Sequence, residues 1–479
     1  MKKLMLLTIA LASGLACFAA ENAVPAVDFR AGFHAIDITP PLGTPISGYY
    51  SRRAASGVLD NLHARCLALS DGSTRALVYS VDNLHIIDDV IAEVKAAIIE
   101  KTRIPADHIF IACTHTHTGA ATAARNSANT IPADEPVIRF ANRFLATRCA
   151  DAAVLALADL APAEIRVGRG EAKGISFVRR FRMKDGSTRT NPGVRNPDIA
   201  EALGQPDEQL QLVRFVRAGK KDIALINFQT HPDVIGGTKF SGDWPALACA
   251  YLEKALGGEA VAMLVNGAQG DTNHINVNPD PLLKNTNKGY EQAHRMAQVV
   301  AGGALAAWGF CHPVPAGKVR AGMPNVTVAL NKAKPEELPE ARRIVALHKA
   351  NRANEIPGSG MQRTSNIAGA YRMLELENKP AEIDMPVSVV AVGTALVFGG
   401  FPGEPFTWMG TEMKAKSPFA MTIPACCVNG SRGYFPVRSA YGPGGYENAT
   451  SRFRPGTAER LVDGILGQIT AFHAAAQKD

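Results

Sequence analysis

The sequence lacks the features that mark several broad classes of protein. After the first 20 residues, no apolar run is long enough to cross a bilayer. There is no cluster of Lys or Arg, and the formal net charge of the 479 residues is only +7. Because a nucleic-acid surface needs clustered positive charge, the composition argues against a nucleic-acid partner. With 46% hydrophobic and 20% charged residues and no internal repeat, the chain has the composition of a globular protein.

The cysteines also lack a diagnostic pattern. There is no CxxC pair of the kind that holds structural zinc. Apart from Cys17, the chain has seven cysteines, and an odd number leaves at least one thiol unpaired or paired between chains. We expect most of them to be buried as small hydrophobic residues. They are Cys66, Cys113, Cys149, Cys249, Cys311, Cys426 and Cys427.

The first 20 residues have the three parts of a secretory signal peptide. Lys2 and Lys3 precede an apolar run, and small residues end at Ala20. This pattern predicts an exported protein, periplasmic or secreted, with a mature region of residues 21–479. Cys17 follows a weak match to a lipoprotein cleavage site, so lipid anchoring at Cys17 is the less favoured alternative.

Hydrophobic periodicity predicts alternating strands and helices. A layered α/β fold follows, with a mixed β-sheet core and flanking helices. Residues 312–326 and 354–366 are rich in Pro or Gly and are expected to be a linker and a loop. Strands are predicted at 74–84, 108–115, 223–231 and 260–271, with two more within 385–404. Helices are predicted at 87–102, 137–160, 244–256, 288–308 and 459–476.

Polar side chains of the types that bind metals follow four of these strands. His115 and His117 end one strand, His231 ends another, and Asp271 and Glu404 follow two more. Ligand crevices of open α/β sheets lie beyond the carboxyl ends of the strands, so a metal site is predicted there. In a strand, residues i and i+2 share a side, so His115 and His117 could face one crevice. Each residue alone is explained as simply by strand capping, an Asx turn or a helix start.

Six stretches, in a fixed order along most of the chain, carry a resemblance to one family. They are GFHAIDITPPLGTPISGY (32–49), LHARCLAL (62–69), THTHTG (114–119), NFQTHP (227–232), FPGEPFT (401–407) and GYFP with two later tyrosines (433–447). Together they resemble the neutral/alkaline non-lysosomal ceramidases. The resemblance implies an α/β amidase that holds one Zn²⁺ per chain. Its substrate would be a small molecule or lipid with an N-acyl group, ceramide or a related lipid, met through transient membrane-surface contact.

The resemblance also implies roles for individual residues. The zinc ligands would be His115, His231, Glu404 and Tyr434. His117 would accept and return the proton. Tyr446 and Arg179 would steady the oxyanion, although Val178 replaces the Asn that precedes this Arg in the family. Asp271, Asn273 and Tyr441 would lie next to the ligands, and a further structural Ca²⁺ or Mg²⁺ is left open.

Some positions depart from the family pattern and keep alternatives open. THTHTGA stands for THTHSGP, and GDTNH lacks a serine. The chain ends at Asp479 without the family's C-terminal β-sandwich, so we expect only the catalytic domain over 21–479. One alternative is the same chemistry on another acylated amine or ester, such as an N-acyl sugar. Others are a metallophosphoesterase built on His115, His117, Asp271 and His274, and an exported binding protein without catalysis.

Overall fold

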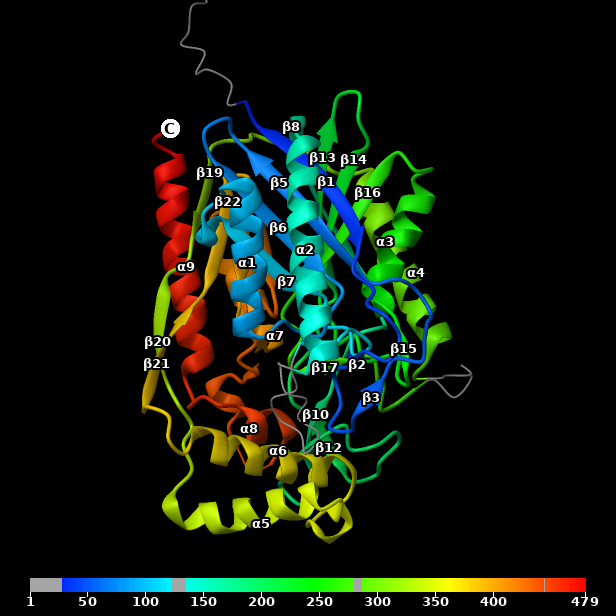
Figure 1. Ribbon diagram of the computed structural model, residues 1–479, viewed down its shortest axis with the longest axis vertical. Helices are drawn as coiled ribbons and strands as arrows, with labels where there is room; N and C mark the ends of the chain where they lie inside the picture. Colours follow the sequence, from blue (N-terminus) through cyan, green and yellow to red (C-terminus); the bar gives the residue numbers. More distant parts are fainter. Residues whose placement is uncertain (1–27, 123–134, 280–286, 443) are drawn as a thin grey trace, which may run out of the picture.

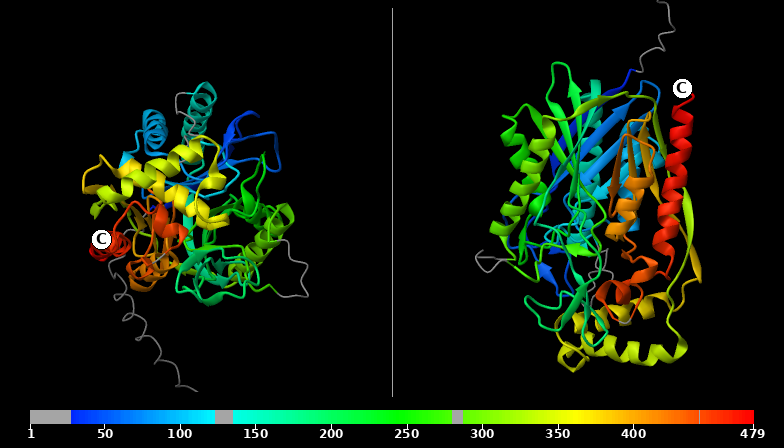
Figure 2. Two further views of the ribbon diagram at one scale, coloured as in Figure 1. Left: turned by 90° about the horizontal axis from the view of Figure 1, so that it is seen from below. Right: turned by 180° about the vertical axis from the view of Figure 1, so that it is seen from behind.

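The structure is a computed structural model, and it describes residues 28–122, 135–279, 287–442 and 444–479. The predicted signal peptide and Cys17 lie outside the described residues. Two sheets pack face to face, with helices on both outer sides, as Figures 1 and 2 show. The predicted layered α/β fold with a mixed sheet is therefore confirmed.

The larger sheet has nine strands among the described residues. Its order is β16 (Ala260–Asn266), β14 (Asp222–Phe228), β13 (Gln209–Arg217), β8 (Ala161–Glu171), β1 (Arg30–Asp37), β5 (His63–Ser70), β6 (Arg75–Val81) and β7 (Ile109–Cys113), with β18 (His312–Val314) paired to β8. The central pairs are antiparallel, whereas β6/β7 and β14/β16 are parallel. A parallel pair needs a crossover, and helices α1 (Asp88–Thr102) and α3 (Asp243–Ala255) provide the two crossovers.

The smaller sheet lies against the inner face of the larger one. Its order is β19 (Val319–Gly322), β22 (Ser388–Val392), β23 (Leu396–Gly400) and β25 (Met421–Ala425). Strand β6 shows how the alternation of side chains builds the layers. Val78 packs into the core between the sheets, while Leu77 and Tyr79 pack with the helices on the outer side.

Helices cover three surfaces of this sandwich. α1 and α2 (Pro136–Ala158) lie over β5–β7, and α3 and α4 (Tyr290–Trp308) lie over β13–β16. α7 (Thr407–Lys416) and α9 (Thr457–Ala476) cover the outer face of the smaller sheet. α5 (Leu338–Lys349) and α6 (Gly360–Leu376) pair with each other at the lower end of Figure 1, and α8 (Tyr446–Thr450) packs against α6.

Short strand pairs complete the fold near that end. They are β2 (Pro45–Ile46) with β3 (Arg53–Ala54), β4 (Gly57–Val58) with β15 (Lys239–Phe240), β9 (Phe177–Val178) with β17 (Thr272–Asn273), β20 (Asn325–Ala329) with β21 (Glu382–Pro386), β24 (Glu404–Pro405) with β26 (Tyr434–Phe435), and β10 (Arg180–Met183) between β11 (Thr188–Thr190) and β12 (Ile199–Ala202). Among the described helices, none has the length and hydropathy that a bilayer span requires.

The larger sheet curls, and this brings its two end strands together. The Asn266 side chain, at the end of β16, donates to the carbonyl of Thr114, just after β7, at 2.9 Å. The Ser80 hydroxyl in β6 donates to the carbonyl of Leu264 in β16 at 2.5 Å. The loops that follow β7 and β14 therefore meet at one end of the sheet.

Most predicted elements are confirmed, and two predictions are wrong. The five predicted helices lie within two residues of their observed ends. The linker predicted at 312–326 instead contributes β18 and β19 to the two sheets. Pro313 lies in β18, which is added to β8 outside the main strand order, so its missing N–H removes no central ladder bond. The loop at 354–366 contains the start of α6 at Gly360. All seven described cysteines are buried, which confirms the expectation for most of them, and all seven are free.

Candidate metal centre

The THTHTG loop presents its side chains on two sides. His115 and His117 lie beyond the end of β7 rather than in the strand, which corrects the strand-based argument. The Thr116 and Thr118 hydroxyls both donate to the carbonyl of Ser241, at 2.8 and 2.9 Å. The histidines face the other way. His115 has a φ of +73°, an uncommon conformation for a non-glycine residue, and its N–H donates to Asn83 O at 2.9 Å.

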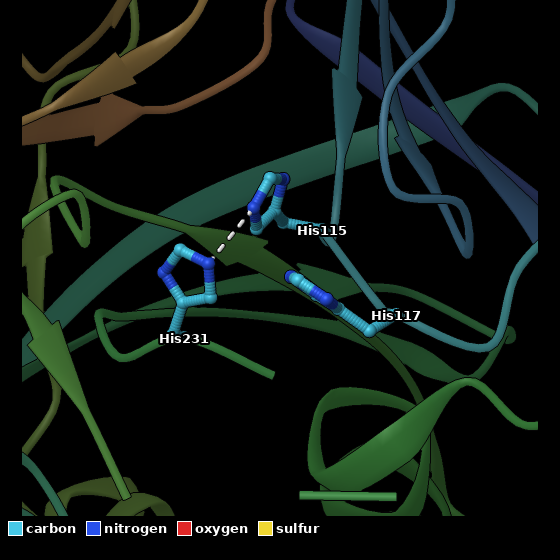
Figure 3. Close-up of side chains that lie close together, drawn as sticks. All are labelled: His115, His117 and His231. Carbon is cyan, nitrogen blue, oxygen red and sulfur yellow. Dashed lines mark hydrogen bonds between the residues drawn. The ribbon is translucent and has the colours of Figure 1, made fainter. Parts of the chain in front are cut away.

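A second loop brings His231 to the same place. It follows β14, and the neighbouring carbonyl of Pro232 accepts the N–H of His117 at 3.1 Å. The Nε2 atoms of His115 and His231 lie 3.2 Å apart, and the two rings meet at 87°. Figure 3 shows the rings of His115, His117 and His231 turned toward one another. The three are buried, and one nitrogen of each lies within 4.8 Å of the others.

Glu404 and Tyr434 reach the same place from a later part of the chain. They are paired residues of the short parallel strands β24 and β26, so one register places both. A Cβ on Gly403 would lie 2.4 Å from Gly433 O, so glycine permits this approach. Glu404 Oε2 lies 3.3 Å from His115 Nε2 and 3.8 Å from His231 Nε2.

These atoms have the spacing of metal ligands. Tetrahedral ligands at about 2.0–2.1 Å from zinc stand roughly 3.3 Å from one another. The three distances of 3.2, 3.3 and 3.8 Å are close to that value. Glu404 Oε2 is buried and has no hydrogen-bond partner among the described residues. His115, His231 and Glu404 could therefore hold a metal ion.

His117 forms an alternative third ligand, but its geometry fits less well. Its ring centre lies 5.3 Å from that of His115 and 5.2 Å from that of His231, against 4.6 Å between those two. Its Nδ1 lies 3.6 Å from Asp233, beyond hydrogen-bond distance. Because the His117 ring stands farther from the other two rings, we favour Glu404 over His117 as the third candidate ligand.

Burial and neighbouring charges set the protonation of the cluster. Burial raises the pKa of Glu404, but His115 and Arg179 outweigh it and bring that pKa to about 2. Burial lowers the pKa of His115, but the Glu404 carboxylate raises it by more, so the pKa lies above its usual value. Burial and neighbouring cations hold the pKa values of His117 and His231 well below the usual range. Both are therefore neutral imidazoles, the form that binds metals or accepts a proton.

A cavity of about 190 Å³ opens onto the cluster. His115, His117, Glu404, Tyr434 and Tyr446 all line it. Burial raises the pKa values of the Tyr434 and Tyr446 hydroxyls well above the usual range, so both are available as proton donors.

Arg179 lies behind this lining. Its Nε is 2.8 Å from Glu447 Oε1, and its Nη2 donates to Gly270 O at 2.6 Å. Its guanidinium carbon lies 5.3 Å from the centre of the Tyr434 ring. Glu447, which is fully buried and also accepts from Thr190 Oγ1 at 2.7 Å, is a residue that the sequence did not single out.

The remaining predicted residues lie outside the cavity lining. Asp271 accepts from Thr407 N and Oγ1, both at 2.7 Å, at the start of α7. The Asn273 amide donates to Asn191 Oδ1 at 2.8 Å, and the Tyr441 hydroxyl donates to Phe453 O at 2.8 Å. Of the three loop tyrosines, Tyr434 and Tyr446 wall the cavity and Tyr441 does not. Neither Asp271 nor His274 belongs to the one three-residue metal-type group found in the described part of the chain.

A curled mixed sheet with a buried group of metal-type side chains beyond its strand ends defines a layered α/β protein with a candidate metal centre. Residues 29–304 match the model of the neutral/alkaline non-lysosomal ceramidase N-terminal family, and the chain belongs to that family. No protein of curated function matches the sequence significantly.

Solved structures share the fold over nearly the whole chain. One is neutral ceramidase from Pseudomonas aeruginosa, with 18% identity and a TM-score of 0.69, covering 93% of this chain and 75% of that one. Another is a ceramidase complexed with C2, with 16% identity and a TM-score of 0.71, covering 94% of this chain and 76% of that one. At these identities the likeness establishes the fold.

Proposed function

We propose that the protein is an exported zinc-dependent amidohydrolase that cleaves an N-acyl bond in ceramide or a related lipid. The observation that carries the proposal is the convergence of His115 Nε2, His231 Nε2 and Glu404 Oε2 beside a cavity that His115 and Glu404 line. Membership of the ceramidase family supports the reaction class. The signal-like N-terminus supports export, and the catalytic unit would span residues 21–479.

His115, His231 and Glu404 would hold the metal, and Tyr434 would be the fourth ligand, since it pairs with Glu404 in register and lines the same cavity. Two imidazoles and one carboxylate form a donor set that suits zinc. When bound, zinc activates water near neutral pH and polarises a carbonyl group.

The other cavity residues supply proton transfer and orientation. Neutral His117 would accept a proton from the attacking water and return it to the departing amine nitrogen as the C–N bond breaks. The Tyr446 hydroxyl would donate to the oxygen of the tetrahedral intermediate. Because Arg179 lies behind Tyr434, we assign it to holding that tyrosine rather than to touching the substrate.

The size of the cavity favours a second candidate substrate. About 190 Å³ is below the roughly 300–1,000 Å³ of pockets that enclose a whole ligand. The cavity would enclose the amide and its nearest substituents, with long chains lying outside, in contact with a membrane surface. A short acylated amine, such as an N-acetylated sugar, would also fit.

Metal analysis and product identification test the proposal together. The purified protein should contain about one zinc per chain and release free fatty acid from ceramide. Acetate release from an N-acetyl sugar, with no fatty acid from ceramide, would favour the second candidate. The His117→Ala variant should keep its zinc and lose most turnover, while His312→Ala, at an exposed position, is the control. Full turnover in His117→Ala would remove the proton-transfer role.

A further inference from the structure

One face of α6 contributes to the cavity wall. Ala368 and Arg372, one helical turn apart, both line it. Arg372 is half-buried and contributes a guanidinium group to a wall that otherwise carries the candidate metal ligands. Its charge therefore faces whatever occupies the cavity.

Arg372 has no acidic partner within ion-pair distance among the described residues. Its Nη1 donates to Asn331 O at 3.2 Å, and its Nε is buried without a hydrogen-bond partner. The nearest acid on its own helix, Glu375, instead binds Arg452 with two bonds of 3.1 and 2.8 Å. Glu337 attracts Arg372 from beyond 4.0 Å, and its carboxylate accepts the N–H of Lys334.

The other arginines of the cavity wall have more partners than Arg372. Two are paired with acids, and the third donates to three backbone carbonyls, although its Nε is also without a hydrogen-bond partner. Arg52 pairs with Glu135 at 3.2 Å, and Arg452 pairs with Glu375. Arg53 donates to backbone carbonyls, among them Gly237 O at 2.9 Å and His117 O at 2.8 Å. Arg372 uses only one of its five N–H donors, on the carbonyl of Asn331. A neutral side chain could make this single bond, so the bond does not explain why a charged residue stands here.

We propose that Arg372 binds an anionic group of the substrate, so that the preferred substrate is an N-acyl amine with a carboxylate, sulfonate or phosphate close to the amide. The inference rests on the proposed amidase function. An uncompensated, half-buried cation is costly in the free protein, and a substrate anion relieves that cost on binding. Arg372 and the candidate ligands His115 and Glu404 line the same cavity, so the anion and the scissile amide would occupy one continuous space.

Four substrates with one acyl chain and one two-carbon spacer test this inference. They are the N-acyl derivatives of ethanolamine, β-alanine, taurine and phosphoethanolamine, which end in a hydroxyl, a carboxylate, a sulfonate and a phosphate. In the zinc-loaded wild type, kcat/KM for at least one anionic substrate should exceed that for the neutral one by about 10–100-fold. The preferred anion identifies the chemistry of the headgroup.

Variants assign the preference to Arg372. The anionic-to-neutral ratio of kcat/KM should fall by about tenfold or more in Arg372→Gln and less in Arg372→Lys, which keeps the charge without the planar fork. Arg343→Gln, on the exposed side of α5, is the matched control. If Arg372→Gln does not fold, the anionic-to-neutral ratio of kcat/KM in Arg372→Lys, compared with that of the wild type, still tests the role of Arg372.

Three outcomes would overturn the inference. If an active wild type has equal kcat/KM values for neutral and anionic substrates, this inference is overturned and the amidase proposal stands. A wild-type preference that survives unchanged in the Arg372 variants overturns the assignment to this residue. No fatty-acid release from any of the four substrates, in a protein that cleaves ceramide, overturns this inference alone, whereas no release from ceramide either overturns the amidase proposal and this inference with it.

Discussion

The candidate metal centre is assembled from two regions that are built differently. Residues 29–304 supply all three histidines, from loops that directly follow the long buried strands β7 and β14. The later region supplies Glu404 and Tyr434 from strands of two residues each. The nitrogen ligands therefore depend on the sheet itself. The oxygen ligands depend on how the second region is held against the first.

Two of the side-chain contacts that join the regions lie near the centre. Asp271, after β16, accepts two hydrogen bonds from Thr407 at the start of α7. Glu447, at the start of α8, binds Arg179 at 2.8 Å and approaches Arg180 at 3.5 Å. One contact is a helix cap and the other a buried ionic cluster, so their removal should have different consequences.

The largest effect is expected when one ligand is removed from each region. His231→Ala and Glu404→Ala should each reduce zinc from about one per chain to near zero and lower turnover by at least about 1,000-fold, because the activated water is lost. Elemental analysis and fatty-acid release measure both quantities, with His312→Ala as the folded control. Full zinc content in either variant would remove that residue from the ligand set.

Breaking the ionic contact should mainly affect stability. Glu447→Gln leaves the buried guanidinium groups of Arg179 and Arg180 without a carboxylate, which should lower the free energy of unfolding by about 3–5 kcal/mol. Denaturant unfolding measures this change. Glu201→Gln removes the exposed partner of Arg182 and should cost no more than about 1 kcal/mol. Equal costs for the two variants would contradict the structural role of Glu447.

The smallest effect is expected at the helix cap. Asp271→Ala should lower the free energy of unfolding by about 1–2 kcal/mol and leave the zinc content unchanged. Thr407→Val, which removes only the hydroxyl, should cost less. Zinc loss in Asp271→Ala would make this residue a ligand and revive the two-metal phosphoesterase alternative.

Periodicity in the sequence predicted five of the helices, α1–α4 and α9, and several strands, among them β6, β7, β14 and β16, because their buried faces repeat every 3.6 or 2 residues. It did not identify the helices α5, α6 and α7 or the central strands β1, β5, β8 and β13. It failed at β18 and β19, which are held by backbone pairing to strands far away in the chain. It also missed the start of α6, whose first turn carries no apolar repeat. Local pattern has no information about such partners.

Among the candidate site residues, the same limit separates the successes from the misses. His115, His231 and Glu404 could be proposed because ligand-type side chains follow apolar strands. Glu447 and Arg372 could not, because a buried ion pair and an uncompensated guanidinium are defined only by what surrounds them. Tyr441 resembled its neighbours in sequence but donates to Phe453 O instead of facing the cavity.

The sequence by itself determined the α/β layering and the types of side chain available for a metal, since both follow from residue chemistry and periodicity. Only the tertiary structure decided that these side chains meet. β7 and β16 stand at opposite ends of the strand order, and they approach because the whole sheet curls. Curvature and charge compensation are collective properties of packed elements, and no single stretch of sequence carries them.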